Sequence, residues 1–521
     1  MESISSKNYL KIYFWRSISI ISGFLSLLIV VPHLSNNKEL YGIYIFCISF
    51  TLYLTYADIG FLGAGQKYAA ESFARGNRVE EIKILGFTGA ILLFMIIPFS
   101  MAMIYFSFNP DLLINGLSHQ GQKTAGDIFL IIGLLSPLQV IIQRLVQSIL
   151  IIRIKDFVSL RIDIVFNLIK IASVFFFFSK GRYLVVEYFF FSTILTILSS
   201  LVVLIIIKKT ENYDFIQLLK SIKFSKKYYL LTKKLAFSSL FLTVGWLVYY
   251  ELDIIIIGNW YGPKDVAIYA IGFTFLNFLR TLWNTVFTPY SQRFNHYSGT
   301  NSVLEMKQLT TKIIDYTFPL CAITTLILAL SAKYIVGLWV GEAYKDSIVI
   351  LQLLIVGTGF GFIIQPASYY FIAKTKYSFI NILALTVPVS FIVGILSLNS
   401  LLGISAFALS KSLAMFISFI ISVIGITALV NPIPIISKWL LNLSVLYIVL
   451  ILLLPKFLDY IFTYQDKNTS ELASLFSVLG ILVVLSYSLL LLTKKQQRQD
   501  IKFIFNKIKR NLQVEKTRSA V

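Results

Sequence analysis

The sequence predicts an all-α integral membrane protein with about 14 transmembrane helices, in which two six-helix lobes in a pseudo-two-fold arrangement precede two C-terminal helices. Three observations support this fold class. The chain of 521 residues is 57% hydrophobic and only 14% charged, which leaves too little polar surface for a soluble protein of this size. Its apolar residues fall into runs of about 20, the length that crosses a bilayer as a helix. Finally, the two halves of the chain carry matching motifs.

The apolar runs are separated by short loops of polar residues, glycine and proline. A helix satisfies all of its backbone polar groups internally, as the bilayer requires, and these runs are too long for barrel strands. The first run lacks a small-residue cleavage site, so we interpret it as a retained helix. The predicted spans are Ile12–Leu34, Tyr41–Leu62, Leu85–Phe106, Ile128–Leu150, Ile162–Phe178, Leu184–Ile207, Leu235–Ile257, Val266–Tyr290, Ile313–Leu330, Ile348–Ile372, Phe379–Leu398, Leu402–Val430, Ile435–Leu454 and Leu472–Leu492.

The placement of lysine and arginine predicts the orientation. Most of the 46 basic residues lie at the two termini and in the loops on the same side of the membrane as the N-terminus. By the positive-inside rule, both termini are then cytoplasmic, which agrees with an even number of spans. The net charge of +21 therefore reflects topology and contact with anionic lipids, and nucleic-acid binding is disfavoured.

Charge and loop length divide the chain. The longest interior connection is the basic segment "KKTENYDFIQLLKSIKFSKKYYLLTKK". The tail places Ile501, Ile504 and Phe505 on one helical face among lysines, which favours an amphipathic helix on the cytoplasmic leaflet over a solvated tail. The predicted divisions are an N-lobe (1–207), a basic cytoplasmic linker (208–234), a C-lobe (235–430), two further helices (431–493) and a basic tail (494–521).

Two pairs of motifs indicate an internal duplication. "NRVEEIK" (Asn77–Lys83) and "NSVLEMK" (Asn301–Lys307) share Asn, Val, Glu and Lys at the same spacing. "GIYIFCISFTLYL" and "AIYAIGFTFLNFL" match in kind at nearly the same offset. The paired segments hold the same position relative to the spans, and each runs inward from the outside, so the repeats are predicted to be parallel, with a site between the halves. The turn "GNWYGP" (Gly258–Pro263) then corresponds to the first outer loop.

Motifs of soluble chemistry are not found. "GLSHQGQKT" (Gly116–Thr124) lacks the lysine of a phosphate-binding loop. The three histidines are scattered, and Cys47 and Cys321 lie in separate apolar spans, which suits packing better than a disulfide. No cofactor is expected, apart from possible coupling to H⁺ or Na⁺.

Charged residues within the predicted spans carry the functional hypothesis, because ionisable groups are costly inside a bilayer. Basic residues lie deeper than acidic ones and are distributed over both halves. We interpret them as a cationic lumen for a crossing anion, since guanidinium binds phosphate or carboxylate through paired hydrogen bonds. Snorkelling remains the alternative for Arg16, and a pair with Asp163 two turns away remains the alternative for Lys170. The candidate substrate-binding residues are Arg16, Arg144, Lys170, Arg280 and Lys411.

Polar and acidic neighbours complete the candidate site. Gln143 and Gln147 flank Arg144, and Asn277 and Asn284 form a polar stripe with Arg280. Glu251 and Asp253 differ by two positions and so point in different directions; either carries a coupling proton or balances Arg280, unless both are simply hydrated near the outer interface. The candidates for ion coupling or charge balance are Glu251, Asp253, Asp163 and Asp58.

Three stretches resemble the polysaccharide-type lipid-linked oligosaccharide flippases (O-antigen translocases and relatives), in the superfamily that includes the multidrug MATE transporters and the lipid II flippase. The first resembles that family's second span, except that Asn36–Leu40 lacks the usual Leu-Gly before Tyr-Gly. The others resemble the start of its second lobe and the segment after its ninth span. They are "LYGIYIFCISFTLYLTYADIGFLGAGQKYAAE" (Leu40–Glu71), "ELDIIIIGNWYGPKDVAIYAIG" (Glu251–Gly272) and "GLWVGEAYKDSIVILQLL" (Gly337–Leu354).

The resemblance implies a transporter rather than an enzyme. Its substrate would be an undecaprenyl-diphosphate-linked oligosaccharide repeat unit of O-antigen, capsule or exopolysaccharide, moved from the inner to the outer leaflet of the bacterial cytoplasmic membrane by alternating access. The polysaccharide polymerase machinery would be a partner. Asp253 and Asp58 match family aspartates at helix ends. The alternatives are a multidrug or other small-molecule exporter of the same fold, which should place deep carboxylates for cations, and a membrane-embedded glycan polymerase or ligase, which should carry a large outer loop.

Overall fold

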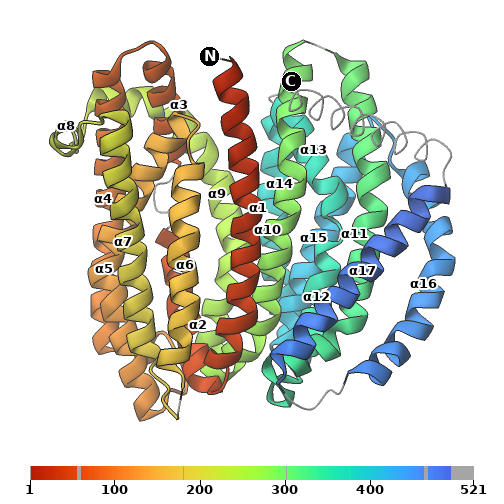
Figure 1. Ribbon diagram of the computed structural model, residues 1–521. Helices are drawn as coiled ribbons and strands as arrows, with labels where there is room; N and C mark the ends of the chain where they lie inside the picture. Colours follow the sequence, from red (N-terminus) through yellow and green to blue (C-terminus); the bar gives the residue numbers. More distant parts are fainter. Residues whose placement is uncertain are drawn as a thin grey trace, which may run out of the picture.

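The computed structural model describes residues 2–54, 60–179, 181–300, 302–374, 376–462 and 467–493, and the chain in these ranges is helical and free of strands. The helices stand roughly side by side (Figure 1). Asp58 and the predicted amphipathic tail lie outside the described residues. The helices are α1 (Glu2–Leu34), α2 (Lys38–Leu54), α3 (Phe61–Ala74), α4 (Arg78–Phe108), α5 (His119–Ile152), α6 (Phe157–Phe177), α7 (Val185–Glu211), α8 (Phe215–Lys220), α9 (Lys226–Trp260), α10 (Pro263–Gly299), α11 (Val303–Val340), α12 (Ser347–Thr358), α13 (Gly361–Ala373), α14 (Tyr377–Leu402), α15 (Ser405–Ile426), α16 (Ile433–Ile461) and α17 (Thr469–Thr493), with 3₁₀ turns η1 (Pro110–Leu112) and η2 (Glu342–Tyr344).

The prediction of a multi-pass membrane protein is confirmed, since many of the helices could span a bilayer. Within the described ranges, 10 helices are long and apolar enough to cross a bilayer, or up to 11 when the bent pair α12 and α13 is taken as one span. The remaining predicted spans coincide with α2, α6 and α9. The total of about 14 therefore stays a prediction.

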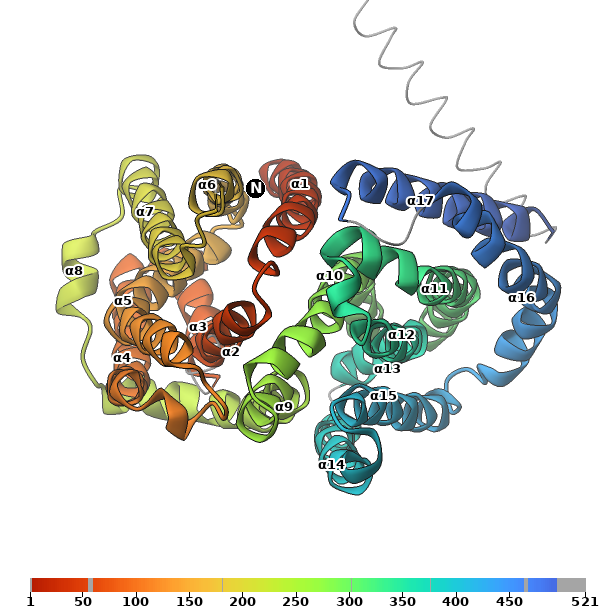
Figure 2. The ribbon, with the colours of Figure 1, turned by 90° about the horizontal axis from the view of Figure 1, so that it is seen from below.

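The helices form two groups beside each other. Viewed from the α1–α2 end, α3 to α7 lie on one side and α10 to α17 on the other (Figure 2). Helix α2 packs against α10, its counterpart in the predicted repeat. Helix α9 contacts α2 and α3 on one side and α14 and α10 on the other. The two groups are thus joined mainly through α2, α9 and α10.

The predicted linker 208–234 is more helical than a cytoplasmic connection requires. Helix α7 continues to Glu211, α8 follows as a short helix, and α9 already begins at Lys226. Asp214 caps α8 by accepting a hydrogen bond from the Gln217 backbone N–H. Helices extend past the apolar run because each further residue adds a backbone hydrogen bond until a cap or breaker intervenes.

The Gly-Asn-Trp-Tyr-Gly-Pro turn separates α9 from α10. Helix α9 ends at Trp260, and Gly262 adopts φ 93°, a conformation that a residue with a side chain rarely takes. Pro263 then occupies the first turn of α10, where its missing N–H costs nothing. In the first half, Asn77 caps α4 by accepting from the Glu80 backbone N–H. The repeat motif there marks a helix start.

The two groups are in close contact at the α1–α2 end. A Cβ on Gly42 of α2 would lie 1.7 Å from the Pro263 carbonyl oxygen, so only glycine permits this approach. Trp339 donates from its indole to the Leu27 carbonyl (3.1 Å), and Tyr344 donates to the Ser35 carbonyl (2.9 Å). These buried contacts between α1 or its turn and the second half hold this end shut.

Candidate functional site

The site is built around a cavity in the second half, between α9, α10, the α12–α13 break and α15. Two adjoining pockets share Tyr250, Arg280, Asn284 and Gln365 in their walls, and one of them encloses about 480 Å³. Further aromatic rings and a larger number of aliphatic, glycine and hydroxyl residues form the remaining surface. The other lining residues are Trp246, Tyr249, Leu276, Trp283, Leu354, Gly357, Thr358, Gly361, Ile364, Ser368, Tyr369, Ile372, Ile380, Leu383, Lys411, Ser412 and Met415.

Arg280 is the central cation of this cavity. It lies on α10, and its guanidinium carbon sits 4.1 Å from the centre of the Tyr250 ring. In the described chain, no carboxylate lies within ion-pairing distance of Arg280. One turn further, Asn284 accepts a hydrogen bond from the Gln365 side chain (3.2 Å). A planar cation stacked on an aromatic ring keeps its N–H donors directed outward, where an oxyanion can accept them.

Lys411 lines the same cavity but forms an ion pair with Asp253. Its Nζ lies 2.6 Å from Asp253 Oδ2, and the two side chains are 2% and 0% exposed. Tyr269 donates to the same carboxylate oxygen at 2.5 Å, and Tyr249 donates to the Lys411 carbonyl at 2.9 Å. A buried ion pair persists only when its members are well oriented and further hydrogen-bonded, as here.

Glu251 is buried beside this pair. The residue is 3% exposed, and its Oε2 has no hydrogen-bond partner among the described residues. Arg280, Asp253 and Lys411 are its charged electrostatic neighbours. Glu251 and Asp253 are therefore both enclosed, and the alternative that they are merely hydrated at the outer interface is wrong. An unsatisfied buried carboxyl oxygen is unusual enough to mark a functional position.

A broken helix forms one wall of the cavity. We expected one span over Ile348–Ile372, but α12 ends at Thr358 and α13 begins at Gly361 with a 41° bend between them. Gly357, Thr358 and Gly361 all line the cavity. A break in a helix interrupts its regular backbone hydrogen bonding, and broken helices are a common feature of transporter binding sites. Three glycines within Gly357–Gly361 are the sequence signal that would have indicated it.

The structure does not bring all five predicted bases together. Arg16 pairs with Asp156 at 3.3 Å, and its side chain is 47% exposed. Lys170 donates to Thr196 at 2.6 Å, within the first half. Asp163 accepts from Ser199 at 2.6 Å, so Asp163 and Lys170 are each held by α7 rather than directly by each other.

The remaining predicted residues line other surfaces. Gln143, Arg144 and Gln147 are half-buried on α5, outside the Arg280 cavity. Asn277 lines a groove of about 430 Å³ between α1, α2 and α10, and its Oδ1 has no partner among the described residues. Of the predicted set, Arg280, Asn284 and Lys411 share one cavity. A binding role for the others stays a prediction.

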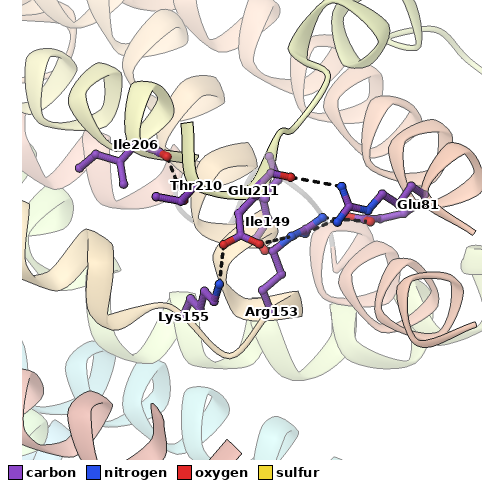
Figure 3. A network of polar contacts seen from close by, with 8 residues as sticks. Glu81, Ile149, Arg153, Lys155, Ile206, Thr210 and Glu211 are labelled. Carbon is purple, nitrogen blue, oxygen red and sulfur yellow. Dashed lines mark hydrogen bonds and ion pairs between the residues drawn. The ribbon is translucent and has the colours of Figure 1, made fainter. Parts of the chain in front are cut away.

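A second charged cluster, which the sequence did not reveal, lies in the first half (Figure 3). Arg153 binds Glu81 at 2.8 Å, and both side chains are almost fully buried. Glu211 lies 3.6 Å from Arg153 and 2.6 Å from Lys155. The cluster connects the ends of α4, α5 and α7, and Arg153 also stacks on Phe73. These charges all have partners, so the cluster fixes the helix ends of this half rather than receiving a ligand.

Comparisons with known proteins identify the fold. No family model and no curated protein matches the chain. Among solved structures, it is similar to the lipid II flippase MurJ in an inward-closed conformation, with a TM-score of 0.70, 17% identity, and 92% of this chain and 97% of that chain covered. It is also similar to an inward-facing multidrug resistance MATE transporter of the MOP superfamily, with a TM-score of 0.59, 13% identity, and 80% and 98% covered. The chain is similar, too, to an outward-facing multidrug resistance MATE transporter of the MOP superfamily, with a TM-score of 0.54, 12% identity, and 82% of this chain and 97% of that chain covered. The chain therefore has the fold of MOP-superfamily transporters.

Proposed function

We propose that this protein moves undecaprenyl-diphosphate-linked oligosaccharide repeat units from the inner to the outer leaflet of the bacterial cytoplasmic membrane, for surface polysaccharide synthesis. The observation that carries the proposal is Arg280, an arginine without a carboxylate partner in the described chain, at the centre of an aromatic and amide-lined cavity. Such a guanidinium can bind the diphosphate of a lipid headgroup through two parallel hydrogen bonds. Aromatic faces and the Gln365 and Asn284 amides suit the attached sugars.

Alternating access supplies the proposed movement. The close packing of α2 on α10 at the α1–α2 end keeps that end shut, and opening it requires the two halves to separate at Gly42 and Pro263. We propose that this end faces outward and that both termini are cytoplasmic, as the basic loops indicate. Lys411 becomes available to the diphosphate only when Asp253 releases it, so we place any H⁺ or Na⁺ coupling at Asp253 and Glu251.

The test compares variants at Arg280 with a matched arginine on the same helix. Arg280→Gln removes the charge, Arg280→Lys keeps it without the bidentate geometry, and exposed Arg293→Gln is the control. Hydrogen bonds to charged groups contribute about 1.5–3 kcal/mol, so binding of a lipid-linked diphosphate sugar to purified protein should weaken about 10- to 100-fold in Arg280→Gln. Arg280→Lys should lose less, and Arg293→Gln nothing. Unchanged binding in Arg280→Gln would overturn the proposal.

Glu251 favours a second candidate, export of a cationic small molecule. A buried carboxylate next to aromatic rings is a suitable receptor for an organic cation. The two candidates differ in their sensitivity to charge. Glu251→Gln should abolish cation export and leave binding of the diphosphate lipid intact, whereas Arg280→Gln should do the reverse.

A further inference from the structure

An apolar pocket lies between α9 and the first half, away from the Arg280 cavity. It encloses about 640 Å³ and is lined by Phe61 of α3, four residues of α4, Phe224 of the linker and two residues of α9. Phe94, Phe224 and Phe237 in its wall are 69%, 65% and 51% exposed, so the pocket opens sideways from the protein. The α4 and α9 residues are Ala90, Ile91, Phe94, Met95, Tyr229 and Phe237.

The linker segment beside this pocket packs closely against α4 and α9. The linker rests directly on α4, because a Cβ on Gly86 would lie 2.5 Å from the Ser221 carbonyl oxygen. Phe61 stacks on Tyr229 with ring centres 6.1 Å apart, and Phe224 lies 5.9 Å from the same ring. The cavity is thus a formed feature of the packing between linker, α3, α4 and α9.

Lysines lie on the helix faces that also carry residues of the pocket wall. Lys83 lies on the face of α4 that also carries Ile91, two helical turns away, and Lys233 lies between Tyr229 and Phe237 on the face of α9. The Lys233 Nζ is 5.9 Å from the Tyr229 ring. Lys226 begins the same face of α9. None of these lysines has a carboxylate within ion-pairing distance in the described chain.

The neighbouring acids do not cancel this charge. Glu80 pairs with Lys227 at 2.7 Å, and Glu81 is taken by Arg153. Lys223, beside Phe224, adds a further exposed base. Eleven residues of α4 separate Lys83 from Phe94, which corresponds to roughly 16 Å along the helix axis at 1.5 Å per residue. Lys83 thus lies one headgroup-to-chain distance along α4 from the apolar pocket, and the pocket and the lysines together complement an acyl chain attached to an anionic headgroup.

We propose that this pocket is a specific site for an anionic phospholipid of the cytoplasmic leaflet, with its headgroup on Lys83, Lys226 and Lys233 and one acyl chain against Ile91 and Phe94. The site is independent of the proposed transport substrate. It lies where α9, which also contacts α14 and α10 of the second half, packs on α3 of the first half.

The test measures lipid binding to the purified full-length protein by native mass spectrometry, with phosphatidylglycerol and phosphatidylcholine of identical acyl chains. Phosphatidylglycerol should bind at least about tenfold more tightly. Each lysine near a headgroup contributes about a fivefold change in affinity, so Lys83→Ala/Lys226→Ala/Lys233→Ala should lose on the order of a hundredfold. The matched triple variant at exposed lysines elsewhere, Lys307→Ala/Lys312→Ala/Lys438→Ala, should bind as the unmodified protein does.

A second variant separates the pocket from the charge. Ala90→Phe fills the apolar slot while all lysines remain, and it should also lose binding of phosphatidylglycerol. Circular dichroism and the thermal unfolding midpoint check that each variant is folded. Equal affinity for the two lipids, or unchanged binding in Ala90→Phe, would overturn the proposal. Binding that emerges only after removal of residues 494–521 would assign the pocket to the chain's own tail and would equally overturn it.

Discussion

The buried pair between Lys411 and Asp253 supports a prediction about stability that also tests the site. Lys411→Met keeps the approximate length of the side chain and removes its charge, leaving the Asp253 carboxylate 0% exposed with the Tyr269 hydroxyl as its remaining side-chain partner. Removing one member of a buried ion pair costs about 3–5 kcal/mol, because the other charge stays buried without compensation. For a lobe of this size, the thermal unfolding midpoint should fall on the order of 10 °C.

Two further variants make the magnitude interpretable. The double variant Lys411→Met/Asp253→Asn removes both charges and keeps an acceptor for Tyr269, so it should recover to within about 1 kcal/mol of the starting protein. Lys333→Met breaks the pair with Asp459, which spans 3.6 Å between side chains that are 50% and 61% exposed. That pair should be worth about 0–1 kcal/mol.

The assay is thermal unfolding of the detergent-purified protein, followed by intrinsic fluorescence. The reasoning is refuted if Lys411→Met is as stable as Lys333→Met, or if the double variant is no better than the single one. Transport is then measured with the stable double variant. Loss of transport in this variant assigns the Lys411–Asp253 pair a role in transport, whereas normal transport limits the pair to a structural role.

Three other predictions follow from single contacts. Gly42→Leu should weaken the closed α1–α2 end, because the leucine side chain would collide with the α10 backbone. Cysteines placed in the Arg280 cavity should then react faster with a membrane-impermeant maleimide. Unchanged labelling would contradict this prediction. Glu81→Gln should lower the free energy of unfolding by about 3 kcal/mol, because its partner Arg153 is buried. The adjacent Glu80→Gln should lower it by under about 1 kcal/mol, because its partner Lys227 is exposed. Equal losses in the two variants would refute the distinction between buried and exposed pairs. Desolvation against the α1–α2 turn lowers the pKa of Lys467 to about 8, so at pH 8 this residue should be acylated faster than exposed Lys345, as measured by peptide mass spectrometry, and equal rates would argue against the shift.

Apolar periodicity predicted most helices well, because a membrane helix must satisfy its backbone internally and carry about 20 apolar residues. Their ends were harder to predict. Helices α9, α10 and α11 all continue well past their apolar cores, and the break at Gly359 between α12 and α13 interrupts an apolar run that hydropathy alone treats as continuous. Composition reports burial in lipid, whereas helix ends depend on caps and breakers that act over single residues.

The candidate site shows the same division. The sequence alone determined that ionisable side chains occupy predicted spans, since their cost in a bilayer makes them conspicuous, and Arg280 and Asn284 were recognised as one polar stripe on a helix. Only the tertiary structure decided which charges meet. Asp253 and Lys411 are 158 residues apart yet 2.6 Å from each other, while Arg16 and Lys170 find partners elsewhere. The physical reason is that a side chain's depth follows from its position along one helix, but its partner depends on how separate helices pack and rotate against one another.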